Sequence, residues 1–214
     1  MTMINIEPVL LPQKSPAISA KRLLDVFLTA LGLVVIWPIL LAIAMAVAFT
    51  SPGPIFFVQT RVGRGGRTFH MLKFRSMYQD AEKRRSDILE TSDREGVCFK
   101  SKADPRITPV GRFLRRWSLD ELPQIFNVLR GEMSLVGPRP ALVDEVVSYP
   151  IHAHGRHAVH PGITGLWQVS GRADIGFDEM IALDLDYVRH KSLVTDLQIL
   201  ARTLHAVVTG KGAY

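Results

Sequence analysis

The residues best suited to catalysis are two adjacent carboxylates, Asp120 and Glu121, which follow Arg115 closely and precede Arg139 by fewer than 20 positions. A carboxylate beside guanidinium groups has its pKa lowered and stays ionised near pH 7, available as a nucleophile or a metal ligand. Arginine side chains, in turn, suit phosphate oxygens. The pattern therefore indicates chemistry on a phosphate-containing substrate.

A structural interpretation of the same carboxylates also exists. Ser118 and Glu121 have the S-x-x-E spacing of a helix capping box, and Asp120 would favour the positive end of the helix dipole. Pro123 weakens this interpretation, because a proline five residues past a Ser118 cap would remove an internal helix hydrogen bond. The capping and the catalytic interpretations can both hold.

The second informative feature is an uncharged apolar run over residues 26–49. It exceeds the roughly 20 residues that a helix needs to cross a bilayer, and it lacks a convincing signal-peptide cleavage site. Pro38 lies near its midpoint, where a proline deletes one backbone hydrogen bond and clashes with the preceding turn. The sequence predicts a membrane helix that is kinked or broken at Pro38.

Basic residues flank the apolar run on both sides. Lys21 and Arg22, followed by Asp25, open it, and Arg61 and Arg64 follow it. The positive-inside rule therefore gives neither end a preference for the far side of the membrane. A re-entrant helix with both ends on the cytoplasmic side and an ordinary spanning helix with a tolerated proline both satisfy this pattern.

Composition agrees with an enzyme at a membrane surface. The chain of 214 residues is 47% hydrophobic, with a mean hydropathy of +0.15, a net charge of +6 and a pI near 9.7. Such a charge favours nucleic acid, acidic lipid headgroups or phosphorylated substrates. No recognisable nucleic-acid module occurs, so we expect no nucleic-acid partner. The single Cys98 excludes an internal disulfide and is interpreted as structural.

We predict an α+β fold, mainly helical, in three parts: a loose leader (1–19), the membrane helix (20–50) and a catalytic domain (51–214). A β-hairpin is expected over 55–62 and 68–77, because the intervening glycines suit a turn better than a phosphate loop. Short helices are expected over 111–117, 119–129 and 140–149, with a solvated one over 79–90. An interrupted final helix spans 175–208, and its leucines at 193, 197, 200 and 204 are predicted to face the core.

Four histidines at 152, 154, 157 and 160 resemble a metal site only superficially. Their spacing matches no known metal-binding pattern, and neither HExxH nor paired CxxC motifs occur. We interpret them as surface residues.

Taken together, the motifs resemble those of bacterial sugar transferases, the monotopic phosphoglycosyl transferases that act on polyprenyl phosphate. The chain is similar to that family from Lys21 to its C-terminus. The matching segments include SPGPIFF at 51–57, KFRSM at 73–77, SLDELPQ at 118–124, FNVLRG at 126–131, MSLVGPRP at 133–140 and PGITG at 161–165. Trp37 departs from the serine that some relatives carry before the proline.

The resemblance implies a specific reaction. Asp120 would attack the sugar-bearing phosphate of a UDP-sugar, with galactose or glucose favoured, and release UMP. Polyprenyl (undecaprenyl) phosphate would then take the phosphosugar from the enzyme, which initiates exopolysaccharide synthesis. Asp120 and Glu121 would also hold Mg²⁺. The implied substrate- and phosphate-binding residues are Lys73, Arg75, Arg115, Arg139 and Arg172.

The resemblance also bears on location. It implies a re-entrant helix broken at Pro38 and anchored by Lys21, Arg22 and Asp25, in the bacterial inner membrane. The catalytic domain would lie on the cytoplasmic face. The resemblance does not decide the oligomeric state, and a homodimer is one of the alternatives. Two other classes also remain open: a membrane-anchored lipid- or nucleic-acid-binding module, and a scaffold for a polysaccharide assembly complex. Both would leave the Asp120–Glu121 pair without a use.

Overall fold

The computed structural model describes residues 19–81, 104–171 and 175–209. Most of these residues are helical. The strands form a three-stranded antiparallel sheet in the order β2-β1-β4 and a parallel pair, β3-β5. The predicted class, a mainly helical protein with a small sheet, is confirmed. The predicted leader (except Ser19), most of the helix expected over 79–90, and Cys98 lie outside the described residues.

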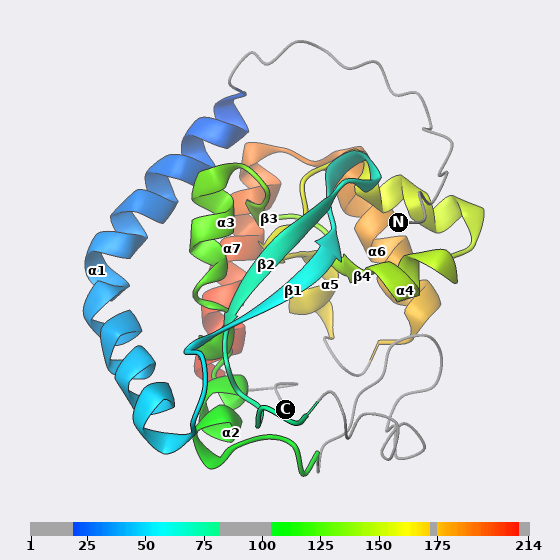
Figure 1. Cartoon of the computed structure of the whole chain (residues 1–214). Coiled ribbons are helices and arrows are strands. Elements are labelled where there is room, and N and C mark those ends of the chain that lie inside the picture. Colours follow the sequence, from blue (N-terminus) through cyan, green and yellow to red (C-terminus); the bar gives the residue numbers. More distant parts are fainter. Residues whose placement is uncertain (1–18, 82–103, 172–174, 210–214) are drawn as a thin grey trace.

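Helix α1 (Ala20–Thr50) is the one helix in the described ranges that is long and apolar enough to cross a membrane. Its first turn is capped by the Ser19 side chain, which accepts from the Arg22 backbone amide at 3.2 Å. Pro38 lies inside a continuous helix that curves along its length (Figure 1). Of the two predicted alternatives at Pro38, a kink or a break, the break is therefore wrong, because a single lost hydrogen bond bends the helix without ending it.

The predicted hairpin is confirmed as β1 (Phe56–Val62) and β2 (Thr68–Phe74), with Phe57 opposite Lys73. A single turn, η1 (Arg64–Gly66), joins the strands, and Gly65 and Gly66 adopt φ values of 66° and 75°. Only glycine adopts such angles without strain, so the glycine cluster serves the turn. The hairpin brings Lys73, near the end of β2, beside the segment that carries the two carboxylates.

The middle of the chain holds the predicted short helices, with several differences in extent. The elements are α2 (Pro109–Arg116), η3 (Leu119–Glu121), α3 (Gln124–Arg130), β3 (Ser134–Val136), β4 (Ala141–Leu142) and α4 (Val143–Val147). The helix expected over 119–129 is thus divided at Pro123, which is the N-cap of α3. The helix expected over 140–149 begins only after β4. Strands of two or three residues are too short to give an alternating pattern, so β3 and β4 were not predicted.

The last part of the described chain contains η4 (Ile151–Ala158), β5 (Gly162–Thr164), α5 (Leu166–Ser170), α6 (Phe177–His190) and α7 (Leu193–Thr209). The prediction that the leucine stripe of α7 faces the core is confirmed for Leu200, which packs against the cluster around Tyr187 and Ile199, and wrong for the other three leucines. Leu193, Leu197 and Leu204 are exposed, whereas Ile199 and Asp196 are buried. Asp196 lies on the buried face because it has partners there, and hydrophobicity alone cannot reveal that.

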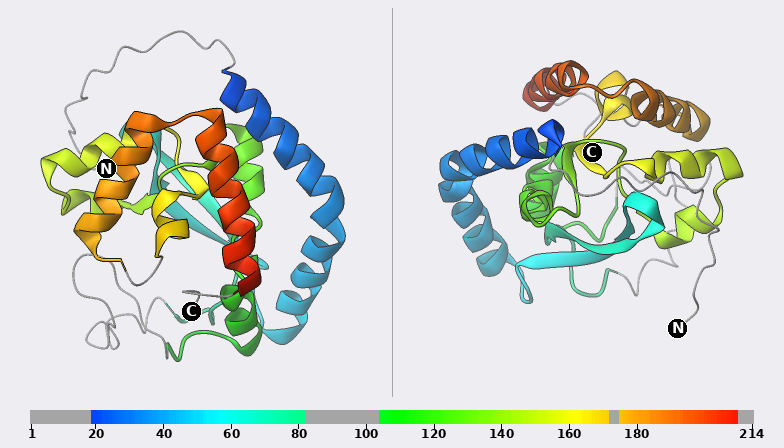
Figure 2. Two further views of the ribbon diagram at one scale, coloured as in Figure 1. Left: turned by 180° about the vertical axis from the view of Figure 1, so that it is seen from behind. Right: turned by 90° about the horizontal axis from the view of Figure 1, so that it is seen from above.

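The elements surround a small interior (Figure 2). In the view from above, α6 and α7 lie along one side, the β1–β2 hairpin lies along the other, and α3 lies between them with α1 on the flank. The largest apolar cluster joins Val62, Val146, Trp167 and Ile181. A second joins Ile43 and Val47, in the last third of α1, to Phe74 and Leu114. Helix α1 is therefore part of the same folded body.

Candidate active site

The two carboxylates lie on η3, a single turn between α2 and α3. Ser118, just before it, has a left-handed conformation with a φ of 55°, the only positive φ of a non-glycine residue in the described ranges. Its side chain forms no cap hydrogen bond. The capping-box interpretation is therefore wrong, because the sharp turn at Ser118 directs Glu121 away from the backbone and toward basic side chains.

Glu121 is the paired member of the dyad. Its Oε1 accepts from Lys73 Nζ at 2.7 Å and from Arg139 Nη1 at 3.2 Å. Burial opposes its ionisation, but the two positive charges and their hydrogen bonds outweigh burial and lower its pKa to about 2. Glu121 is therefore a fixed negative charge that orients Lys73 and Arg139.

Asp120 is the unpaired member. Its side chain is buried, and it forms no hydrogen bond or ion pair with any side chain of 19–81, 104–171 or 175–209. Burial, with the neighbouring Glu121 charge, raises its pKa above the usual aspartate value despite Lys73, Arg115 and Arg139. The prediction of a lowered pKa is thus confirmed for Glu121 and wrong for Asp120, because pairing was assumed for both.

Arg115 completes the basic surroundings of Asp120. Its Nε donates to Ser76 Oγ at 2.9 Å, which fixes it to the chain just after β2. Burial lowers the Arg115 pKa, while the Asp120 charge opposes this effect. Among the described side chains the cluster thus holds three cations, Lys73, Arg115 and Arg139, against two carboxylates. One positive charge is left over for an anion.

Arg139 lies on a tight loop between β3 and β4. The loop begins at Gly137, where a Cβ atom would lie 2.4 Å from the His160 carbonyl oxygen, so only glycine fits. The Arg139 side chain is 37% exposed, the most open of the residues that contact Glu121. Its guanidinium can therefore contact a ligand while one nitrogen stays on Glu121.

Two residues of this region were not identified from the sequence. Arg61, interpreted as a membrane-flanking charge, is buried and donates to the Pro140 carbonyl oxygen at 3.0 Å. Burial and the nearby Arg139 lower its pKa to about 10. Asn127 is fully buried and joins α3 to β2 through Leu72 N at 3.0 Å and His70 O at 2.7 Å. A basic residue inside a predicted strand was the available signal for Arg61.

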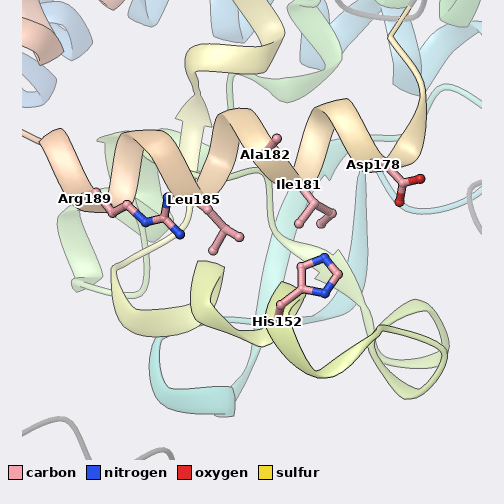
Figure 3. A pocket seen from close by; sticks show the side chains of 6 residues that line it. All are labelled: His152, Asp178, Ile181, Ala182, Leu185 and Arg189. Carbon is pink, nitrogen blue, oxygen red and sulfur yellow. The ribbon is translucent and has the colours of Figure 1, made fainter.

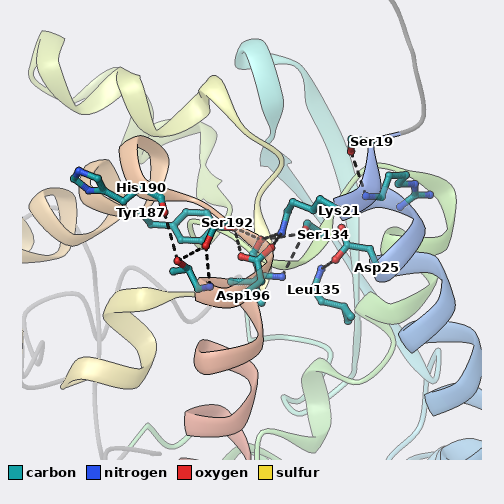
Figure 4. A network of polar contacts seen from close by, with 12 residues as sticks. Ser19, Lys21, Asp25, Ser134, Leu135, Tyr187, His190, Ser192 and Asp196 are labelled. Atoms are coloured by element: carbon teal, nitrogen blue, oxygen red, sulfur yellow. Dashed lines mark hydrogen bonds and ion pairs between the residues drawn. The ribbon is translucent and has the colours of Figure 1, made fainter.

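The structure places the other predicted residues elsewhere. Arg75 Nη2 donates to Ser51 O at 2.6 Å and to Ser51 Oγ at 2.8 Å, which holds the end of α1, away from the dyad. Arg172 lies outside the described residues. The start of α1 is held by Lys21 Nζ on Asp196 Oδ2 at 2.6 Å and by Asp25, which accepts from Leu135 N at 3.2 Å (Figure 4).

Comparison with known proteins decides the family. The profile described as bacterial sugar transferase matches residues 16–210. The chain belongs to the bacterial sugar transferase family. The sequence-based resemblance is thereby confirmed.

Three relatives illustrate the match. A galactosyl transferase, CpsE, of Streptococcus agalactiae is 45% identical over 195 residues, covering 91% of this chain and 43% of the relative. The exopolysaccharide production protein ExoY of Sinorhizobium fredii is 39% identical over 213 residues, covering 95% and 94%. A UDP-glucose:undecaprenyl-phosphate glucose-1-phosphate transferase of Xanthomonas campestris is 45% identical, covering 91% and 40%. The chain thus spans less than half of two relatives and nearly all of the other.

The histidines of this sugar transferase lie apart from the dyad. Of the four histidines at 152, 154, 157 and 160, His152 is exposed and the other three are partly buried, so the surface prediction is confirmed for His152 and holds only in part for the others. Burial lowers the pKa of His157 to about 4, which keeps it neutral. In the described ranges no three His, Cys, Asp or Glu residues are grouped to hold a metal by themselves.

A pocket of about 220 Å³ lies between η4 and α6 (Figure 3). His152, Asp178, Ile181, Ala182, Leu185 and Arg189 line it. None of them belongs to the cluster around Asp120. The candidate active site is therefore the cluster of charged side chains around η3 and not this pocket.

Proposed function

We propose that this chain transfers a sugar 1-phosphate from a UDP-sugar to polyprenyl phosphate, with undecaprenyl phosphate favoured, and releases UMP. The observation that carries the proposal is the Asp120 carboxylate, which has no hydrogen-bond partner in the described ranges and lies among three cations. Two of the relatives, a galactosyl transferase and a glucose-1-phosphate transferase, favour galactose or glucose.

The reaction proceeds in two displacements. An Asp120 carboxylate oxygen forms a bond to the phosphorus that bears the sugar, and the bond from that phosphorus to the UMP oxygen breaks. A phosphate oxygen of the lipid then attacks the same phosphorus and releases the Asp120 carboxylate. The two-step route avoids a direct reaction between the UDP-sugar and polyprenyl phosphate, which are both negatively charged. Asp120 must be ionised for the first step, so its raised pKa makes turnover sensitive to acid.

The basic side chains have separate tasks in this scheme. Arg139, the most exposed cation that contacts Glu121, binds the diphosphate through its fork. The charges of Lys73 and Arg115 both act on Asp120, and these two side chains stabilise negative charge on the transferring phosphate. Glu121 keeps Lys73 and Arg139 aligned through the hydrogen bonds it accepts.

The dyad also suits Mg²⁺. Magnesium is usually held by one or two carboxylates together with substrate phosphates and water. In the described ranges, Asp120 and the Oε2 atom of Glu121 accept no hydrogen bond, so both can serve as ligands. When bound, the ion neutralises the diphosphate and the departing UMP oxygen.

We further propose that α1 is re-entrant, with both ends on the cytoplasmic face of the inner membrane. Its second turn contacts β3 through Asp25, and its last turns contact α2 and β2 through Ile43 and Val47. Between them, Val34, Val35 and Trp37 are exposed by 71%, 68% and 57%. A spanning helix would put its two ends on opposite sides of about 30 Å of hydrocarbon, so one polar body could not hold both.

Cysteine labelling in intact cells tests this topology. With Cys98→Ser as background, we expect cysteines at position 14 and position 64 to be equally protected from an impermeant reagent. Arg64 is the second site because it is exposed, whereas Arg61 is buried. Labelling at one position and not at the other would establish a spanning helix.

The reaction is tested with purified protein, a panel of UDP-sugars, Mg²⁺ and polyprenyl phosphate. We expect UMP release with UDP-galactose or UDP-glucose, and its loss in Asp120→Asn. A lipid- or nucleic-acid-binding module would keep its affinity after Asp120→Asn and release no UMP in any form. A scaffold would support polysaccharide assembly in cells equally well with either residue.

A further inference from the structure

The loop that carries Arg139 is held by its carbonyl oxygens. The Pro138 oxygen accepts from Gly162 N at 2.9 Å, and the Pro140 oxygen accepts from Arg61 Nη1 at 3.0 Å. The oxygen of Arg139 itself accepts from Arg156 Nη2 at 2.9 Å. A carbonyl that is partly removed from water is stabilised by a donor, and here a charged side chain from η4 supplies it.

Arg156 is fixed in turn by two further elements. Its Nη2 also donates to Asp184 Oδ2 on α6 at 2.6 Å, and its Nη1 donates to the Tyr149 hydroxyl at 2.7 Å. The side chains of Arg156 and Asp184 are only 3% and 1% exposed. The guanidinium therefore has one geometry, set by α6 and by Tyr149, and it presents one nitrogen to the Arg139 backbone.

An ion pair this deeply buried needs a reason besides stability. Burying two charges costs desolvation that their attraction often fails to recover, and apolar residues of similar size are often equally stabilising. No apolar side chain, however, can donate to the Arg139 carbonyl oxygen. The distinctive task of Arg156 is thus its contact with the backbone of the phosphate-binding candidate.

We propose that Arg156 is a positioning residue that acts through Arg139: held by Asp184 and Tyr149, it fixes the Arg139 peptide and hence the direction of the Arg139 guanidinium. This inference rests on the proposed function, in which Arg139 binds the nucleotide diphosphate. A displacement of about 1 Å in such a group costs on the order of 100-fold in rate. Arg156 touches neither substrate nor the reacting atoms.

A double-substitution cycle on the full-length protein tests the inference. Kinetic constants for UMP release are measured in the wild type, Arg156→Lys, Arg139→Lys and the double variant, with a thermal melt of each in detergent. Lysine keeps the charge opposite Asp184 but loses the planar fork that reaches three acceptors at once. We expect Arg156→Lys to lower kcat/KM for the UDP-sugar by about 10- to 100-fold, and by less than about threefold when Arg139 is already lysine.

The melts separate positioning from folding. The loss of thermal stability from Arg156→Lys should be the same in both backgrounds, because only the activity depends on the Arg139 side chain. Arg106→Lys is the matched control, since Arg106 is also a buried arginine paired with an aspartate, Asp104, at 2.7 Å. Its effect on kcat/KM should be multiplicative with that of Arg139→Lys.

If Arg156→Lys does not fold, Asp184→Asn replaces it, since this change loosens the hold on Arg156 and keeps the residue volume. The same coupling to Arg139 is expected. Multiplicative losses for both Arg156 and Asp184 variants, in an enzyme whose wild type releases UMP, would overturn the positioning role alone. A wild type that released no UMP from any UDP-sugar would overturn the proposed function and this inference with it.

Discussion

Two clusters of buried charge in this protein use similar residue types but differ in whether each group has a partner. At the base of α1, Asp196 accepts from Lys21 at 2.6 Å and from Tyr187 at 2.8 Å, and both donors also reach the Val136 carbonyl oxygen (Figure 4). The charges of Lys21 and Asp196 cancel. Around η3, by contrast, three cations face two carboxylates, and Asp120 accepts from no side chain of the described ranges.

Whether every charged group has a partner distinguishes a structural network from a candidate active site. A complete network has no remaining capacity for a ligand, so it can only hold elements in place, as Lys21 and Asp196 hold α1 against α7. In an incomplete cluster, a buried charge without a partner destabilises the fold, and a bound anion or metal ion can offset this free energy. The same fold thus contains a closed cluster that positions α1 and an open cluster suited to a charged substrate.

The largest effect should come from substituting the carboxylate without a partner. Asp120→Asn should reduce UMP release by more than about 1,000-fold, because an amide is a far poorer nucleophile than a carboxylate. The melting temperature should hold or rise, since a buried charge without a partner is removed. Asp196→Asn is the matched control from the closed cluster, and it should cost stability while activity per folded molecule stays within about threefold. Equal losses of activity in the two variants would show that the open and the closed cluster do not differ in function.

The next largest effect is expected at Arg139. Arg139→Ala should nearly abolish turnover, and Arg139→Lys should reduce it by about 10- to 100-fold, because lysine keeps the charge and loses the fork. Folding and membrane association should be retained, since the side chain is 37% exposed. UMP release measured beside a thermal melt in detergent decides the matter. Near-native activity of Arg139→Ala, or a loss explained by unfolding, would remove the phosphate-binding role.

A smaller effect is expected on the pH dependence of kcat/KM, which Glu121→Gln should shift. Because the Asp120 pKa is raised and the ionised form is the nucleophile, kcat/KM should rise with pH through that pKa and fall below it. Glu121 has a pKa of about 2 and stays ionised throughout the assay range. Glu121→Gln removes a negative charge that raises the Asp120 pKa, so the acid limb should move to lower pH, whatever the loss in rate. A limb that stays in place or moves upward would show that another group controls it.

The smallest effect on chemistry should follow from opening the closed cluster. Lys21→Met leaves Asp196 without its cation and should lower the free energy of unfolding by about 1–3 kcal/mol, less than for a fully buried pair because Lys21 is 27% exposed. The kcat of the folded fraction should change by less than about threefold. Denaturation in detergent and UMP release provide the two readouts. A loss of kcat as large as that of Arg139→Lys would mean that this cluster belongs to the active site.

The sequence predicted the long elements and the site better than the short elements and the pKa values. The long apolar helix and the hairpin follow from length, alternation and glycine placement. An interruption of the final helix was predicted, but its position between α6 and α7 was not. Strands β3, β4 and β5 contain two or three residues each, and their pairing depends on segments far away in the chain. The continuity of α1 through Pro38 depends on its remaining helical hydrogen bonds. The sequence around Pro38 does not show whether these hydrogen bonds are enough to keep the helix continuous.

The grouping of the candidate-site residues was predicted from the sequence, but the different environments of Asp120 and Glu121 were not. Lys73, Arg115 and Arg139 are brought to the dyad as expected from their motifs, whereas Arg75 holds the end of α1. Adjacency in sequence suggested equal environments for Asp120 and Glu121. The structure gives them opposite pKa shifts, because η3 turns one carboxylate toward Lys73 and Arg139 and leaves the other without a donor in the described ranges.

The most direct test of the central claim is intact-protein mass measurement after rapid quench. Wild-type protein is mixed with Mg²⁺ and UDP-galactose or UDP-glucose, without lipid acceptor. We predict a gain of one phosphosugar per chain on a peptide containing Asp120, its disappearance on addition of polyprenyl phosphate, and its absence in Asp120→Asn. An active enzyme that showed no adduct at any quench time, with sequential in place of ping-pong kinetics, would contradict the role of Asp120 as nucleophile.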